Sequence, residues 1–326
     1  MMNTFSHTTN ISYTYSPNFR GQATYEILKI GNKEKILRHE TAFFRDYHTI
    51  KKSVDYLKNT FPNSTDKQIV VGACSSGEQA LSIEMLMKKQ KHHILGFDIS
   101  PKSVEEAKKL TFQIHKPKNK KSRTEIKNRN IVGYNDEFLA FNSGVQFSAN
   151  TQKKLKKIFN QTFIEIETIP KKVNCFKMLM NKLKYLIANV IEPEFLTKTF
   201  KVRRPNDVKC DFVEGDIQNL DKLVPKGKAH MITFSNALYH LVTEDICYGA
   251  IREKLPKAEV NKVIVNVAKQ VNKALTNRGL FVIGEHEDKQ MTDMKLVSKI
   301  LEENGFKSLE KKKGKYCNIW VKYKDV

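Results

Sequence analysis

Three polar residues, Asp98, Asp216 and Asn236, each follow a short apolar segment that is typical of a buried strand. In parallel sheets, ligands bind outside the carboxyl ends of the strands. An acid at the end of the second strand, such as Asp98, binds ribose hydroxyls in nucleotide-binding folds. Asp216 has the chemistry to accept a hydrogen bond from an adenine amino group. Together the three residues predict a single nucleotide-type cleft.

A loop of small residues, Gly72-Ala73-Cys74-Ser75-Ser76-Gly77-Glu78, joins the first apolar segment to a helix. Such a loop lets a ligand approach the backbone at the helix N-terminus. The loop does not read GxGxxG, and it lacks the lysine of a phosphate-binding P-loop. A tight structural turn is therefore the alternative for the loop, and an acid at a helix start is the alternative for Asp98.

The elements that must position these residues alternate between strand and helix. The sequence predicts strands over residues 68–73, 93–97, 210–213, 231–234 and 280–283. It predicts helices over residues 40–61, 79–89, 100–110, 260–275 and 291–304, and a closing antiparallel hairpin over 306–309 and 316–321. This alternation predicts a doubly wound α/β fold with a mostly parallel sheet covered on both faces.

Residues 111–205 interrupt the alternation where a short connection is expected. They hold 20 Lys and Arg against 7 Asp and Glu, a net charge of +13 within a chain total of +22. Helices are expected over 151–163 and 173–190. We predict that this segment is a basic accessory insert, which would favour anionic partners such as nucleic acid or acidic protein segments.

Other features narrow the class of protein. The five scattered cysteines form no CxxC pair and no metal-ligand spacing with histidine, which indicates a reducing compartment and predicts no metal. No apolar run approaches the length of a membrane span and no signal pattern opens the chain, so a cytoplasmic protein is expected. Residues 1–38 are predicted to be a flexible N-terminal arm before a domain over 39–326, and the sequence carries no signal for an oligomeric state.

Five segments, in order along the chain, resemble motifs of the CheR family of protein-glutamate methyltransferases. They read HETAFFRD (39–46), ACSSGEQALSI (73–83), GFDIS (96–100), FSNAL (234–238) and GLFVIGEHE (279–287). The FFRD segment ahead of a small-residue loop with Gly-Glu is the most specific of them. The resemblance implies a Rossmann-like class I methyltransferase with a seven-stranded sheet, using S-adenosylmethionine (SAM).

The resemblance also implies roles for individual residues. Thr41 and Arg45 would lie over the methionine part of the cofactor, and Glu78 would lie near its amino group. Asp98 would bind the ribose, and Asp216 and Ile217 would flank the adenine. Gly72 would belong to the cofactor loop, and Asn236 would line the methyl-transfer cleft. Arg45, Asn236 and Tyr239 are the candidate catalytic residues, with Arg45 guiding the acceptor carboxylate and Tyr239 or His240 shaping its pocket.

The chain departs from the family near the substrate: Ser235 replaces an arginine, and Tyr239-His240-Leu241 replaces a typical Ile-Tyr-Phe. We therefore expect methylation of glutamates in an acidic, chemoreceptor-type protein, and two alternatives stay open. One is a methyltransferase that acts on RNA or another nucleic acid through the basic insert, with His240 as a general base. The other is a catalytically degenerate scaffold.

Overall fold

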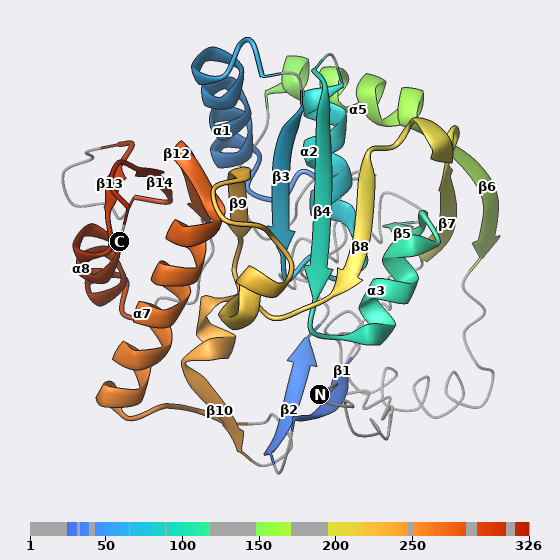
Figure 1. Cartoon of the computed structure of the whole chain (residues 1–326). Helices are drawn as coiled ribbons and strands as arrows, with labels where there is room; N and C mark the ends of the chain where they lie inside the picture. Colours follow the sequence, from blue (N-terminus) through green and yellow to red (C-terminus); the bar gives the residue numbers. More distant parts are fainter. Residues whose placement is uncertain are drawn as a thin grey trace, which may run out of the picture.

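The computed structural model describes residues 25–30, 33–38, 43–64, 66–88, 90–117, 148–170, 195–246, 251–284, 292–310 and 317–325. Its centre is a seven-stranded sheet with the order β13-β14-β12-β9-β3-β4-β8. The five parallel strands are β3 (Lys67–Gly72), β4 (His92–Asp98), β8 (Cys210–Glu214), β9 (Ala229–Phe234) and β12 (Leu275–Ile283). The predicted doubly wound, mostly parallel sheet is therefore confirmed, and its carboxyl ends lie together at the bottom of Figure 1.

The two last strands confirm the prediction of an antiparallel hairpin at the edge of the sheet. β14 (Ile319–Lys322) lies between β12 and β13 (Phe306–Ser308) and is antiparallel to both. β13 is therefore parallel to β12 and forms the edge. The position of β14 explains the burial of Trp320, whose ring is 1% exposed inside the sheet.

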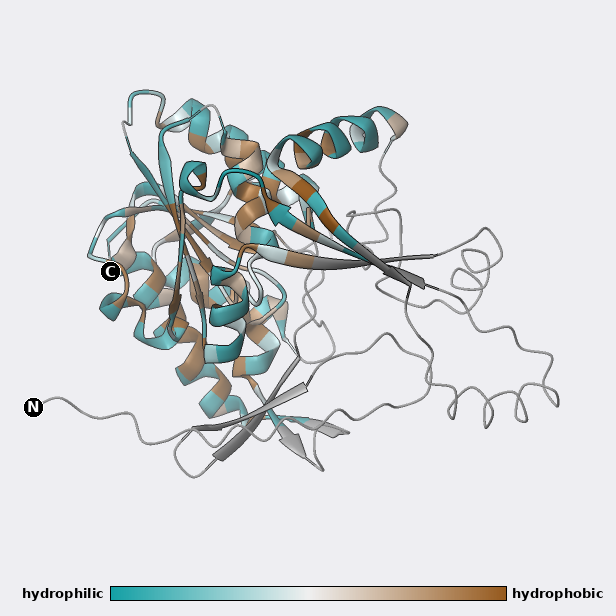
Figure 2. Cartoon of the chain, turned by 90° about the vertical axis from the view of Figure 1, so that its right-hand side faces the viewer, coloured by the Kyte–Doolittle hydropathy of each residue, from teal (hydrophilic) through white to brown (hydrophobic). Residues whose placement is uncertain are grey.

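Alternating side chains of the strands supply two hydrophobic cores, one on each face, because successive residues of a strand point to opposite faces. One face of the sheet is covered by α1 (Tyr47–Thr60), α2 (Glu78–Met87) and α3 (Pro101–Lys108). The other face is covered by α7 (Lys257–Ala274) and α8 (Met294–Glu303), with the short helix η2 (Ile217–Lys222). Ile69 and Val71 of β3 pack on the face of α1, α2 and α3, whereas Val70 packs on the opposite face. Hydrophobic residues lie between these layers in Figure 2.

The segment before α1 is a turn over residues 43–46 instead of the predicted helix that begins at residue 40. Phe44 and Asp46 have φ angles of 58° and 55°, in the left-handed region that a right-handed helix cannot contain. Phe43 and Phe44 are buried at 3% and 1% exposure. Their packing therefore holds the turn in this conformation.

Within the predicted insert, residues 111–117, 163–170 and 195–202 form a separate antiparallel sheet of order β5-β7-β6. Its strands are β5 (Thr111–Pro117), β6 (Phe163–Pro170) and β7 (Phe195–Val202), and α5 (Ala149–Thr162) precedes β6. The edge-to-face contacts of Phe43 with Phe112, Phe159 and Phe163, at centroid distances of 5.1–5.2 Å, join this sheet to the core. The predicted helix over 173–190 lies outside the described residues.

Two hairpins lie near the carboxyl ends of the parallel strands (Figure 1). They are β1 (Tyr25–Ile30) with β2 (Lys33–Arg38), and β10 (Thr243–Ile246) with β11 (Ile251–Lys254). The first hairpin lies within the N-terminal arm predicted over residues 1–38, and the flexibility of that arm stays a prediction. Residues 1–24 lie outside the described part of the chain. Among the described helices, none is both long and apolar enough to span a membrane.

Candidate active site

Asp98 ends β4 and fixes the loop that follows β3. Its Oδ2 accepts a hydrogen bond from the Ser75 amide at 2.8 Å, and its Oδ1 accepts one from the Ser100 amide at 3.0 Å. The residue is 7% exposed. Each carboxylate oxygen has a second lone pair, so Asp98 can still accept a hydrogen bond from a ligand hydroxyl. The expected helix start at Ser100 is confirmed, because its Oγ accepts from the Ser103 amide at 3.0 Å.

The loop between β3 and α2 is held in an unusual backbone conformation. Ala73 and Ser75 have φ angles of 51° and 49°, and Gly77 has a φ of 95°. Non-glycine residues in the left-handed region cost free energy, and such residues gather at functional sites. At Gly72, a Cβ would lie 2.6 Å from the Phe97 ring, so close packing explains the glycine there. A direct contact of Gly72 with the cofactor stays a prediction.

Glu78 opens α2 beside this loop. The Ser76 hydroxyl donates to both Glu78 carboxylate oxygens, at 3.0 and 2.9 Å, and the Glu78 side chain is half-buried. Burial raises the pKa of the Cys74 thiol in the same loop, and the negative charges of Asp98 and Glu78 raise it further. Cys74 is therefore a neutral packing residue, and the negative potential of the loop favours a cationic ligand such as a sulfonium or an amino group.

Asp216 and Ile217 follow β8, next to Asp98. The Gly215 amide donates to the Asp98 carbonyl oxygen at 2.9 Å, which couples the two strand ends. Asp216 is half-buried, and its Oδ1 accepts from the Gln218 amide at 2.9 Å. Ile217 is 1% exposed and packs in the core with Leu220. Its side chain thus serves the core here, and its contact with adenine stays a prediction.

Asn236 follows β9 and bonds to the FFRD turn. Its Nδ2 donates to Asp46 Oδ2 at 2.8 Å, and both residues are buried, at 8% and 1% exposure. Arg45, next to Asp46, is half-buried. The turn also bonds to α2, because the Phe44 amide donates to Ser82 Oγ at 2.8 Å. The structure therefore brings the FFRD turn, α2 and the end of β9 together.

Tyr239 lies in the short helix η3 (Leu238–Leu241), one turn after Asn236. Its ring packs against His240 with the centroids 4.0 Å apart, and both side chains are half-buried. Thr243 Oγ1 donates to the Tyr239 carbonyl oxygen at 2.7 Å, which joins η3 to β10. Thr41 lies outside the described residues.

Sequence reasoning gave no role to several residues that assemble this site. Gln79 Nε2 donates to Ser235 Oγ at 2.8 Å and thereby joins the start of α2 to the end of β9. For Asp46, the sequence offered one indication of a role, namely its position as the last residue of the FFRD motif. Ser235, noted as a departure from the family, is the partner of Gln79. Among the described residues, no group of three His, Cys, Asp or Glu could hold a metal ion.

The residues at this edge fit SAM in their chemistry. A buried acid at the end of β4 accepts a hydrogen bond from the strained small-residue loop before α2, and the carboxylates of Asp98 and Glu78 give that loop a negative potential. These are features that a nucleoside and a sulfonium require. In this reading Asp98 would hold the ribose, and the loop with Glu78 would hold the methionine part.

Comparison with known proteins agrees with this reading. Residues 39–144 match the model of the CheR methyltransferase SAM-binding domain. The resemblance stated from the sequence and the SAM cofactor are thus confirmed. The match includes the FFRD turn, the loop after β3 and Asp98, and it leaves out Asp216, Asn236 and Tyr239. A search of curated proteins found no match.

Several solved structures are similar in fold. The [4+2]-cyclase SpnF matches with a TM-score of 0.34 and 9% identity over 80% of this chain. The CurJ carbon methyltransferase matches with 0.39 and 9% over 85%, and the DszA carbon methyltransferase with 0.42 and 9% over 86%. This chain spans 58%, 55% and 54% of those three chains. At such identities and scores, the likeness says nothing about the reaction.

Proposed function

We propose that this chain, which carries the SAM-binding domain of the CheR methyltransferases, methylates glutamate side chains of a protein. The observation that carries the proposal is the hydrogen bond between Asp46 and Asn236. This bond supports a role for Arg45, the residue before Asp46, because it holds the FFRD turn at the carboxyl end of β9. A guanidinium there suits an acceptor that arrives as a carboxylate.

The chemistry asks little of the protein beyond binding and orientation. The cofactor supplies a methyl group carried on a sulfonium, and a glutamate carboxylate is already a nucleophile at neutral pH. No proton has to move, so no general base is required. The chain's residues must align the carboxylate and exclude water. In the proposal Arg45 binds the carboxylate, Asn236 lines the cleft and Tyr239 shapes the acceptor pocket.

The test is the fate of a labelled methyl group. Labelled SAM is incubated with the protein and host lysate, and samples are treated with protease, RNase or mild alkali. Glutamate methyl esters should be lost with protease and should release volatile methanol in alkali. Label that resists alkali, or that disappears with RNase but not with protease, would refute the proposal and favour a nucleic acid acceptor.

Two variants of Arg45 test whether transfer of the label depends on the candidate active site. Arg45→Ala should slow transfer strongly, by tenfold or more, which corresponds to about 1.4 kcal/mol or more in the transition state. Arg45→Lys should restore only part of the rate, because lysine lacks the planar fork that pairs with a carboxylate. Arg278→Ala is the matched control, since Arg278 lies at the opposite end of β12 from the site. Equal rates for Arg45→Ala and the control would exclude Arg45 from acceptor binding.

A further inference from the structure

A hollow lies at the amino edge of the sheet, where β4 and β8 begin, away from the candidate active site. It has a volume of about 1110 Å³ and lies between the end of α2 and start of β4 on one side and residues 202–209 on the other. Strands of six to seven residues separate the two edges, which corresponds to about 20 Å. We call this hollow the amino-edge cleft.

Five cationic side chains line the amino-edge cleft: Lys88, Lys91, Arg203, Arg204 and Lys209. All five residues are exposed. Within the described part of the chain, Lys88, Lys91 and Lys209 have no carboxylate within 4.0 Å. Their positive charge is therefore open to a ligand.

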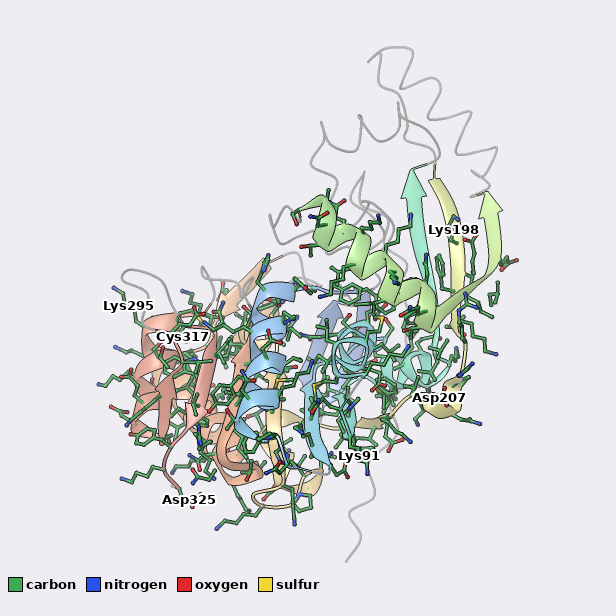
Figure 3. The ribbon with its side chains drawn as sticks, turned by 90° about the horizontal axis from the view of Figure 1, so that it is seen from above. Lys91, Lys198, Asp207, Lys295, Cys317 and Asp325 are labelled. Atoms are coloured by element: carbon green, nitrogen blue, oxygen red, sulfur yellow. The ribbon has the colours of Figure 1, made fainter. Side chains whose placement is uncertain are left out.

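Two of the three acidic residues that line the amino-edge cleft already have a partner. Glu84 accepts a hydrogen bond from the buried ring of His92, and Asp207 lies 3.7 Å from Arg204. Asp66 is the third acid of the lining. Figure 3 looks down on this edge and shows Lys91 and Asp207 there. The cleft is therefore positive overall, because five cations face three carboxylates.

Helix α5 extends the positive surface away from the cleft. Gln161 lines the cleft, and Lys157 and Lys153 lie one and two turns earlier on the same face of the helix. Lys154 and Lys156 are exposed as well, and α5 contains no acid. Its 14 residues span about 21 Å. The opposite face, with Leu155 and Phe159, is buried, so the lysines of α5 lie on its solvent-exposed side.

The lining indicates which kind of anion fits. Met85 and Val202 are apolar but only 4% and 3% exposed, and half-buried Val208 is the third aliphatic or thioether residue of the lining, so the described residues offer no large or aromatic anchor. Specific protein docking depends on such anchors, often aromatic. A flat lipid surface would not reach into a concave site. A phosphate backbone, in contrast, is bound by charges and hydrogen bonds alone.

We propose that the amino-edge cleft and the exposed face of α5 bind the phosphate backbone of a nucleic acid strand. No Phe, Tyr or Trp lines the cleft among the described residues, so bases are not stacked and binding does not depend on sequence. The site lies at the opposite edge from the candidate active site, so it holds the strand without presenting it for methylation. This inference does not depend on the identity of the methyl acceptor.

The experiment measures anisotropy of a labelled 20-nucleotide single strand with the full chain at several salt concentrations. The five cleft cations, with Lys153 and Lys157 of α5, would neutralise seven phosphates. This predicts a slope of log affinity against log salt of about −4.9, and a loss of about 900-fold between 50 and 200 mM salt. The triple variant Lys88→Ala, Lys91→Ala, Lys209→Ala removes three contacts. Its slope should be about −2.8, with a loss of about 50-fold over the same range.

The matched control is Lys262→Ala, Lys269→Ala, Lys295→Ala, which removes the same charge from exposed positions of α7 and α8. It should retain the slope of the unmodified protein, and circular dichroism checks that both variants fold. Equal slopes for the two triple variants would overturn the proposal. So would a poly-glutamate peptide, or vesicles of anionic lipid, that bind more tightly than the strand and depend on Lys88, Lys91 and Lys209.

Discussion

The Asn236 side chain donates a hydrogen bond of 2.8 Å to the Asp46 carboxylate, across 190 residues of sequence. Both residues have left-handed backbone conformations, with φ angles of 56° and 55°. Gly284, at the end of β12, packs so tightly here that a Cβ would lie 2.4 Å from Asn236 Oδ1. The FFRD turn is therefore fixed to two strand ends at the candidate active site.

Replacement of Asp46 should loosen this arrangement. In Asp46→Ala, the buried Asn236 amide loses its acceptor, which should lower the free energy of unfolding by about 1–3 kcal/mol. Methyl transfer should fall more than cofactor affinity, because Asn236 and Arg45 lose their common support. Urea titration, transfer rates and calorimetry with S-adenosylhomocysteine measure the three quantities.

The control is Asp55→Ala on α1, where Asp55 pairs with Lys51 of the same helix and with no other cation that the structure describes. An exposed pair of this kind contributes little, so unfolding should change by less than about 0.5 kcal/mol. An Asp46→Ala protein with the stability and transfer rate of this control would show that the bond to Asn236 positions nothing.

Asp98 should contribute directly to cofactor affinity. A hydrogen bond to a charged group contributes about 1.5–3 kcal/mol, so Asp98→Ala should bind S-adenosylhomocysteine about 10- to 150-fold more weakly in calorimetry. Glu214→Ala is the control, because Glu214 is the exposed register partner of Asp98 on β8. Unchanged affinity in Asp98→Ala would remove Asp98 from the site.

The sequence predicted the five parallel strands well because each is a short apolar run that ends in small or polar residues. It did not predict that β14 lies inside the sheet, since a strand's neighbours depend on packing between segments far apart. The turn at Phe44 and Asp46 was missed for a related reason. Phe does not signal a left-handed φ and Asp signals it only weakly, and the turn is held by contacts with Ser82 and Asn236.

The sequence predicted those residues of the candidate site that directly follow a strand. Asp98, Asp216 and Asn236 do lie at the carboxyl edge, because parallel strands bring their ends together. The partner of Asn236 could not be derived, since Asp46 is 190 residues away. Ile217 was assigned to the adenine from the family resemblance. Its side chain packs in the core, and a contact with adenine stays a prediction.

Phe43 should contribute strongly to the stability of the junction with the β5-β7-β6 sheet. Phe43→Ala should cost about 3–5 kcal/mol of unfolding free energy, because a buried ring is lost and a cavity is left behind. Ile166→Ala is the control on β6, where the side chain is 51% exposed, and it should cost less than about 0.5 kcal/mol. A small loss in Phe43→Ala would mean that the junction collapses around the missing ring.

The contacts of Phe43 with the β5-β7-β6 sheet and α5 show that residues 111–205 cannot be removed without disturbing the core. If the insert were only an accessory segment, deleting residues 116–204 would leave cofactor binding intact. However, Phe159, Phe163 and Phe200 lie within the deleted range and cover Phe43. The deletion would expose the FFRD turn, so substitution of exposed lysines is the better test of the insert.

Buried His92 and half-buried His230 should give the free energy of unfolding opposite dependences on pH. Burial alone would lower the pKa of His92, but its hydrogen bond to Glu84 and the Glu84 charge outweigh burial and raise it. Burial, followed by the charge of Lys67, lowers the pKa of His230. In the unfolded chain both rings titrate near the ordinary value of 6.5.

A raised folded pKa stabilises the protein below pH 6.5, and this contribution is lost as the pH rises through the folded value. His92→Gln should therefore lower the free energy of unfolding more at pH 5.5 than at pH 9. For His230 the sign is reversed, because its neutral form is favoured in the fold. Unfolding by urea at the two pH values measures both differences against the unmodified protein. If the loss in His92→Gln is the same at pH 5.5 and pH 9, the His92–Glu84 contact does not hold a proton in the folded state.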